Sequence, residues 1–153
     1  MSVAFECRTE LPTTVHQSFD LARNIDLHVD SMSRSKERAV GGVTGGLIAA
    51  GDEVSWRARH FGIPFRMTSR ITSMFAPDSF VDEQVRGPFR TFRHEHTFIA
   101  RDGETTMIDH VEFSAPFGIL GRVAERVVLA RYLRRLIEQR NQFLAAAAAD
   151  HTR

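Results

Sequence analysis

The stretch Thr91–Ser114, TFRHEHTFIARDGETTMIDHVEFS, contains two runs rich in Thr, Phe, Ile and Val that flank Asp102-Gly103. Asp-Gly between two such runs is a strong signal for a β-hairpin with a two-residue turn. If these two residues form the turn, Arg101 faces Glu104, and the remaining pairs follow by counting back along both strands. The stretch therefore predicts a long hairpin and its register.

Side chains alternate along a strand, so the same count assigns each residue of the hairpin to one of two faces. One face is apolar and must point inward, because it carries Phe92, Phe98, Met107, Val111 and Phe113. His94, His96 and Asp109 fall on this inward face, with His96 directly opposite Asp109. Ionisable groups among buried apolar residues need partners, and this cluster is the main chemical signal in the sequence.

In the rest of the chain, the spacing of apolar residues predicts a series of strands followed by one long helix at the C-terminus. Strands are predicted for residues 2–9, near 37–42, and for 52–61, 65–75 and 80–86. Two short helices are predicted after the first strand, one behind the capping box Thr14-x-x-Gln17 and one over residues 25–31 capped by Asn24.

From Leu120 the apolar period changes to 3.6 residues, which predicts a helix that ends near Ala149. Its apolar stripe includes Ile137 and Phe143, and Arg140 is assigned to its polar side. Residues 146–153 are expected to be a frayed tail. A meander of antiparallel strands must bury one face, and this helix is the element long enough to cover it.

The composition indicates one domain spanning residues 1–153, with an ordinary apolar fraction of 42% and a net charge of +1. Nothing in this balance calls for nucleic acid as a partner. No apolar run approaches the ~18 residues of a membrane span. One cysteine, Cys7, excludes an intrachain disulfide, and no secretory segment is visible at the N-terminus. We therefore expect a cytoplasmic protein, a monomer or homodimer, with Cys7 as a small core residue.

Two other features favour plain structural interpretations. The glycine-rich stretch 41–46 matches neither dinucleotide-binding nor P-loop spacing, so a bulged or bent entry into the next strand is expected. Arg57, Arg59, Arg66 and Arg70 fall on the outer face of two adjacent strands. We interpret them as solvated surface, with nucleic acid or an acidic partner as the alternative.

The predicted order is one strand, two short helices, six strands and one long helix, and several motifs accompany it. They are Gly51–Gly62 (GDEVSWRARHFG), Phe80–Gln84 (FVDEQ), Gly87-Pro88-Phe89, His94–Phe98 (HEHTF), Asp109 and Pro116-Phe117-Gly118. In this order and these motifs the chain resembles the START-like (SRPBCC) superfamily, specifically bacterial ligand-binding proteins often labelled cyclase/dehydrase.

The resemblance implies an α+β helix-grip fold, in which an antiparallel sheet of about seven strands wraps around the long C-terminal helix. It also implies a cavity between sheet and helix that takes a hydrophobic or amphipathic small molecule, lipid-like or polyketide-like. Members of the superfamily include lipid carriers and aromatic cyclases, so the fold alone does not choose among these functions.

The inward faces of the strands define the residues expected to line such a cavity. The expected ligand-binding residues are Trp56, His60, Met67, Ile71, Phe80, Asp82, Gln84, Phe92, His94, Phe98, Met107, Val111 and Phe113. An apolar lining with a few placed polar groups is typical of ligand pockets. If Gly87-Pro88 centres the connection before the hairpin, Asp82 lies near His94.

Four interpretations of the polar cluster remain open. The histidines and aspartates can be satisfied structural pairs, the polar end of a ligand pocket, or a general acid/base pair of His96 and Asp109. The fourth is a metal site, because His94-x-His96 points both imidazoles the same way. Ligand binding is the function we expect, without cofactor or metal, and the alternative is an aromatic polyketide cyclase or dehydratase using His96 and Asp109.

Overall fold

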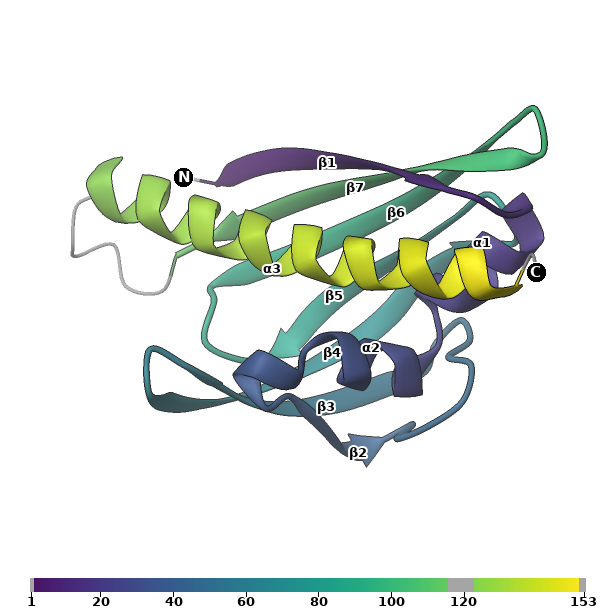
Figure 1. Ribbon diagram of the computed structural model, residues 1–153. Helices are drawn as coiled ribbons and strands as arrows, with labels where there is room; N and C mark the ends of the chain where they lie inside the picture. The colour runs from purple at the N-terminus through teal and green to yellow at the C-terminus, as the bar shows by residue number, and fades with distance from the viewer. Residues whose placement is uncertain (1, 116–122, 152–153) are drawn as a thin grey trace.

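The computed structural model describes residues 2–115 and 123–151 (Figure 1). The motif Pro116-Phe117-Gly118 and the predicted helix start at Leu120 lie outside this part of the chain. The described elements form one seven-stranded antiparallel sheet and three α-helices, as the resemblance implied. The strands are β1 (Val3–Leu11), β2 (Arg38–Gly42), β3 (Glu53–His60), β4 (Ile63–Phe75), β5 (Ser79–Arg86), β6 (Thr91–Arg101) and β7 (Glu104–Ser114).

The spatial order of the sheet is β1-β7-β6-β5-β4-β3-β2, so six consecutive strands meander and β1 pairs with the last of them. The hairpin of β6 and β7 has the predicted register over its whole length, from Arg101 opposite Glu104 to Thr91 opposite Ser114. Asp102 and Gly103 both have positive φ, 47° and 83°, as a two-residue hairpin turn requires. The predicted proximity of Asp82 to His94 is also confirmed, because the two are opposite each other on β5 and β6.

Two short helices follow β1 and begin where the sequence predicted. Asn24 caps α2 (Ile25–Ser31) by accepting a hydrogen bond from the Leu27 amide at 3.1 Å. Thr14 caps α1 (Val15–Ala22), but the capping box is incomplete. The Gln17 side chain accepts from the Thr13 hydroxyl instead of reaching back to the backbone of Thr14. A 3₁₀ turn, Ser33–Ser35, occupies part of the segment predicted as a loop.

The C-terminal helix α3 (Val123–His151) lies along the concave side of the sheet, nearest β1 (Figure 1). It continues through His151, so residues 146–151 are helical where a frayed tail was expected, and residues 152 and 153 lie outside the described part of the chain. Alanine has the highest helix propensity, and Ala148 is fully buried against the core. Phe143, which was assigned to the buried stripe, is 37% exposed, whereas Leu144 is buried.

Two apolar clusters hold the helix on the sheet and leave space between them. The first gathers around α1 and the C-terminal half of α3, where Phe19 meets Phe80 and Phe98 edge-on at 5.6 and 5.5 Å. The second lies under the middle of α3 and consists of Phe5, Cys7, Val111, Phe113 and Ile137. The interior is therefore closed at two places.

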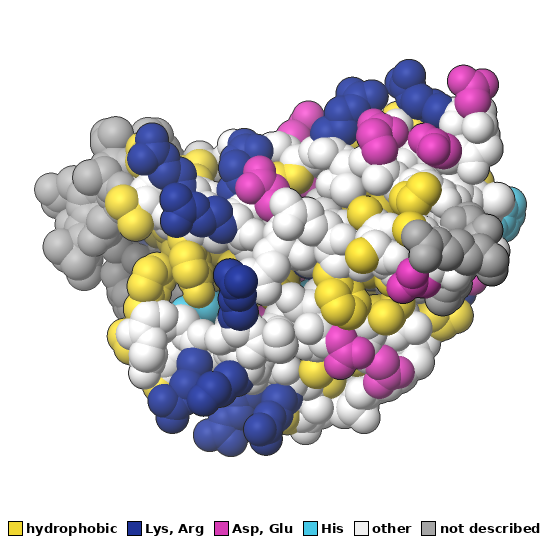
Figure 2. Space-filling view, in the orientation of Figure 1, with side chains coloured by type: hydrophobic (Ala, Val, Ile, Leu, Met, Phe, Trp, Pro, Cys, Tyr) yellow, Lys and Arg dark blue, Asp and Glu magenta, His cyan; other side chains and the backbone are white. Residues whose placement is uncertain are grey.

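The glycine-rich stretch and the outer-face arginines agree with the structural interpretations made from the sequence. The glycine-rich stretch begins with a register shift between Ala39 and Gly41, and an added Cβ at Gly42 would lie 2.1 Å from the Glu53 carbonyl oxygen. Arg57, Arg59 and Arg66 are exposed, and Arg70 pairs with Glu53 at 2.8 Å. Basic side chains gather at the lower edge of the molecule, where Figure 1 places β3 (Figure 2).

The helices in the described ranges include none with the length and apolar character needed to cross a bilayer.

The reactivity of Cys7 tests whether the second apolar cluster is closed to solvent. Burial raises the pKa of the thiol to about 11, although the nearby Arg134 acts in the opposite direction. Because the thiolate is the reactive form, Ellman's reagent at pH 8 should modify the folded protein at least ~100-fold more slowly than the chain unfolded in guanidinium. Comparable rates in the two states would show that this part of the core is open.

Candidate functional site

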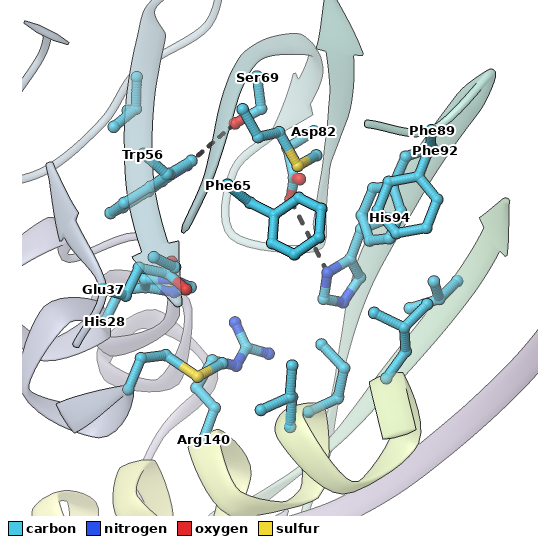
Figure 3. Close-up of a pocket in the computed structure, with 18 of the residues that line it drawn as sticks. His28, Glu37, Trp56, Phe65, Ser69, Asp82, Phe89, Phe92, His94 and Arg140 are labelled. Atoms are coloured by element: carbon cyan, nitrogen blue, oxygen red, sulfur yellow. Dashed lines mark hydrogen bonds and ion pairs between the residues drawn. The ribbon is translucent and has the colours of Figure 1, made fainter. Parts of the chain in front are cut away.

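A cavity of about 330 Å³ lies between the sheet and α3, within the size range of small-molecule pockets. Its walls are mostly apolar and aromatic and come from α2, the inner faces of β3 to β7, and α3. Figure 3 shows how Trp56, Phe65, Phe89 and Phe92 converge on this space.

Most of the predicted ligand-binding residues line the cavity. They are Trp56, His60, Met67, Ile71, Phe80, Asp82, Phe92, His94 and Val111, and His96 joins them. Phe98, Met107 and Phe113 share the inward face but fill the two core clusters, because α1 and α3 pack directly onto them. Gln84 does not line the cavity either, since its amide bonds the backbone N–H and carbonyl of Phe89 in the loop before β6.

The histidine–aspartate pairs are the reverse of those expected from the register. His96 lies opposite Asp109 in the ladder, yet its Nε2 bonds Asp82 at 2.8 Å. His94 lies opposite Asp82, yet its Nε2 bonds Asp109 at 2.7 Å. Diagonal neighbours on one face of a sheet are within reach of long side chains. The ladder therefore does not determine which imidazole bonds which carboxylate.

Ring stacking accompanies this diagonal pairing. The His96 ring lies between those of Phe80 and His94, with centroid distances of 4.1 and 3.8 Å. An ionised carboxylate only accepts hydrogen bonds, so each imidazole donates from Nε2. His94 Nδ1 is then an acceptor, 4.0 Å from Asp82 Oδ2 (Figure 3).

Asp109 is fully buried and holds the cluster to α3. Its Oδ1 accepts from Arg140 Nη2 at 2.7 Å as well as from His94, and its Oδ2 accepts from Asn141 Nδ2 at 2.7 Å. Arg140 is only 3% exposed, so its assignment to the polar side of the helix was wrong. The sequence contained a signal for this, because residues 140 and 141 continue the stripe from Ile137 to Leu144 at helical spacing.

Burial and charge set the protonation of these groups. Burial would raise the pKa of Asp109, but Arg140 and the hydrogen bond from His94 hold it well below its usual range. Asp82 shows the same balance, with burial outweighed by His96 and His94, so its pKa is lowered. Burial lowers the pKa of His94 to about 4, with His96 adding to the effect. At neutral pH both carboxylates are ionised and His94 is neutral.

A second polar region lies at the other side of the cavity, and of its members the sequence predicted Trp56 and His60 but not His28, Glu37 or Tyr132. His28 Nε2 and Glu37 Oε1 are 2.6 Å apart, and the His28 ring lies 4.5 Å from that of Trp56. His60 Nδ1 and the Tyr132 hydroxyl are also 2.6 Å apart. The first contact joins α2 to Glu37, just before β2, and the second joins β3 to α3. The partners are 9 and 72 residues apart and belong to different segments, so neither pair follows from the periodicity of a single strand or helix.

One group of side chains in the described part of the chain could hold a metal ion. Asp82, His94 and His96 each offer a ligand atom, and these atoms lie within 4.8 Å of one another. The site can therefore bind a hydrogen-bonding ligand group, position a proton acceptor at His94 Nδ1, or coordinate a cation.

The buried ion pair of Asp109 and Arg140 can be tested by replacing Arg140→Met. The change leaves a buried carboxylate without its cation, so the free energy of unfolding should fall by about 3–5 kcal/mol in urea at pH 7. Arg135→Met on the exposed side of α3 is the matched control and should change it by under ~0.5 kcal/mol.

The pH dependence of the free energy of unfolding should also change in the Arg140→Met variant. A carboxyl whose folded pKa is depressed stabilises the protein above its unfolded pKa of about 4 and loses this contribution as pH falls further. In Arg140→Met the folded pKa of Asp109 rises, so less stability should be lost on acidification than in the unchanged protein. Identical acid profiles would contradict the pairing.

Solved structures share this fold across almost their full length. The Zhui aromatase/cyclase from Streptomyces sp. R1128 aligns with a TM-score of 0.77 at 15% identity, covering 100% of this chain and 97% of that one. A START superfamily protein from Mycobacterium smegmatis gives a TM-score of 0.73 at 7% identity, covering 96% and 97%. Ginseng major latex-like protein 151 from Panax ginseng gives 0.68 at 13% identity, covering 96% and 97%. Such low identities show the fold alone.

No curated protein matches the sequence significantly. One family does match, and its sequence profile aligns with residues 14–139, which include α1, α2, strands β2 to β7 and the described part of α3 up to Gln139. Its description is polyketide cyclase/dehydrase and lipid transport. The match covers most of the chain and agrees with the helix-grip architecture, so the protein belongs to this START-like polyketide cyclase/dehydrase and lipid transport family.

Proposed function

We propose that this protein binds one hydrophobic or amphipathic small molecule in the cavity between the sheet and α3. The observation that carries the proposal is an apolar cavity of about 330 Å³ with a few polar side chains converging at one end. An apolar ligand body gains free energy by leaving water, roughly 25 cal/mol per Å² buried. Polar groups at fixed positions then select and orient the ligand.

The polar end indicates the kind of ligand group that fits there. His94 Nδ1 is an acceptor, and Asp82 is an ionised carboxylate at the same end of the cavity. A hydroxyl, phenol or enol can donate to these atoms. A ligand carboxylate would meet the negative charge of Asp82, while Arg140 is already paired with Asp109. The geometry favours a neutral amphipathic ligand with a hydroxyl-type head, a class that includes phenolic polyketides and lipid alcohols.

Trp56 provides a direct measurement of binding. It is the one tryptophan in the sequence and lines the cavity, so its fluorescence reports on occupancy. Native mass spectrometry of the purified protein should show a retained apolar molecule, and dodecanol should change Trp56 emission saturably. Ala58 lies on the cavity wall, and Ala58→Leu should weaken dodecanol binding roughly tenfold by filling the space.

The control for this variant is Arg59→Leu, the next residue on the outer face of the same strand. It adds a similar apolar side chain at an exposed position outside the cavity lining, so dodecanol affinity should stay unchanged. Equal affinities for both variants, or no saturable change in Trp56 emission, would contradict binding in this cavity.

A second candidate is cyclisation or dehydration of an aromatic polyketide, and a specific contact favours it. Asp109 fixes the His94 ring by accepting from Nε2, which leaves the Nδ1 lone pair on the side of Asp82, another residue of the cavity wall. A base held in this way can remove a proton from carbon next to a ligand carbonyl. The residue proposed as base is therefore His94, with Asp109 as the positioning residue, in place of the predicted pair of His96 and Asp109.

Proton exchange gives a test of this chemistry without a known substrate. An aryl ketone bound in D₂O should gain deuterium at the carbon next to the carbonyl, followed by NMR. His94→Asn should slow the exchange by about 10²-fold, the lower end of the usual contribution of a general base, because the lowered pKa of His94 makes it a weak base. His28→Asn, at the other side of the cavity, should retain it. Exchange that is equally fast in both variants, with ketone binding intact, would exclude His94 as the base.

A further inference from the structure

We propose that Asp82, His94 and His96 form a binding site for a divalent transition-metal ion, zinc being the best match, at the polar end of the cavity. This goes beyond ligand binding and does not depend on it. Two imidazole nitrogens and one carboxylate oxygen form a donor set that suits zinc, and a three-residue set leaves a coordination position open.

The distances between the donor atoms fit an ion of this size. Tetrahedral ligands at ~2.0–2.1 Å from zinc lie roughly 3.4 Å from each other. Asp82 Oδ2 is 2.8 Å from His96 Nε2 and 4.0 Å from His94 Nδ1, values on either side of that separation. All the ligand atoms lie within 4.8 Å of one another. Small rotations of the terminal torsions of Asp and His, which are broad, can bring the three atoms onto one ion.

The surroundings of His94 are those of a metal ligand. Ligating histidines almost always donate their second ring N–H to a carboxylate or carbonyl. His94 donates from Nε2 to Asp109, and Asp109 is held in turn by Arg140 and Asn141. This fixes the tautomer with the lone pair on Nδ1, the atom that faces Asp82.

A second, independent observation in favour of the metal site concerns His96. Its Nδ1 is buried and makes no hydrogen bond, although Asp109 Oδ1 is 3.3 Å away. When the ring carries one proton and donates it from Nε2 to Asp82, the Nδ1 lone pair faces the Asp109 acceptor. Binding of an ion at Nε2 moves the ring proton to Nδ1, which can then donate to Asp109. The ion thus satisfies a buried polar atom that is otherwise unpaired.

The same carboxylate would then support both imidazoles. Asp109 becomes the shared hydrogen-bond partner behind two ligands, while Asp82 coordinates directly. The open coordination position faces the cavity, since Asp82, His94 and His96 all line it. A ligand hydroxyl or carbonyl oxygen, or water, can fill that position. Elsewhere in the described ranges no other group of three His, Cys, Asp or Glu side chains has this arrangement.

The test uses the intact chain after removal of metal with a chelator. Zinc should bind at one equivalent with micromolar or tighter affinity. Cobalt(II) should give the intense visible absorption of a four- or five-coordinate ion, not the weak bands of hexaaqua cobalt. Asp82→Asn and His96→Gln should each lower zinc affinity at least ~10-fold, and Asp109→Asn should lower it ~10–100-fold although it removes no ligand.

His28→Gln is the matched control, because His28 also faces the cavity beside a carboxylate, Glu37, but has no third ligand. It should leave zinc affinity unchanged. Circular dichroism on every variant separates loss of metal binding from loss of fold, and Asp82→Asn and His96→Gln provide two independent ligand changes.

Two results would overturn the site: no zinc binding below millimolar concentration, or equal zinc affinity in the unchanged protein and in folded Asp82→Asn and His96→Gln variants. Dodecanol titration in the presence of chelator tests small-molecule binding separately. A protein that binds dodecanol but no zinc would retain the proposed function and lose the metal site.

Discussion

The structure depends on one buried carboxylate, Asp109, and on the groups that neutralise it. A carboxylate taken out of water costs several kcal/mol unless it is paired and hydrogen-bonded. Here Arg140 and Asn141 come from α3 and His94 comes from β6. The same contacts therefore satisfy the charge, fix the position of the long helix over the sheet and orient the imidazole that faces the cavity.

This arrangement separates structural from functional roles within one cluster. Asp109 is fully buried behind His94 and His96, whereas Asp82 lies at the cavity wall. The first carboxylate can act on a ligand only through the imidazoles, and the second can touch it directly. In ligand binding, proton transfer and metal binding alike, Asp109 would support the imidazoles from behind. The three functions differ in the group that contacts His94 Nδ1 and Asp82.

The cavity itself follows from packing at two separate places. α1 and the end of α3 close one part of the interior around Phe19 and Phe98, and the middle of α3 closes another around Phe113. The cavity lies between the sheet and the helix, bordered by both clusters, and the polar cluster lines it. Phe98 and Phe113 have the same strand periodicity as the cavity-lining Phe92, so periodicity identifies the inward face but not which inward residues meet another element.

The sequence by itself determined the hairpin, its register, the inward face, the strand order along the chain and the long C-terminal helix. These depend on local rules: a two-residue turn sets register, and side chains alternate on strands and repeat every 3.6 residues on helices. Such rules placed His94, His96, Asp82 and Asp109 together correctly.

Only the tertiary structure decided how those groups pair and what else joins them. His94 bonds Asp109 and His96 bonds Asp82, because side-chain torsions and ring stacking favour the diagonal neighbours over the directly opposite ones that the register predicts. Arg140 is 31 residues from Asp109, and His60 meets Tyr132 across 72 residues. Contacts of this kind depend on where the helix docks, and docking is set by the packing of the whole core.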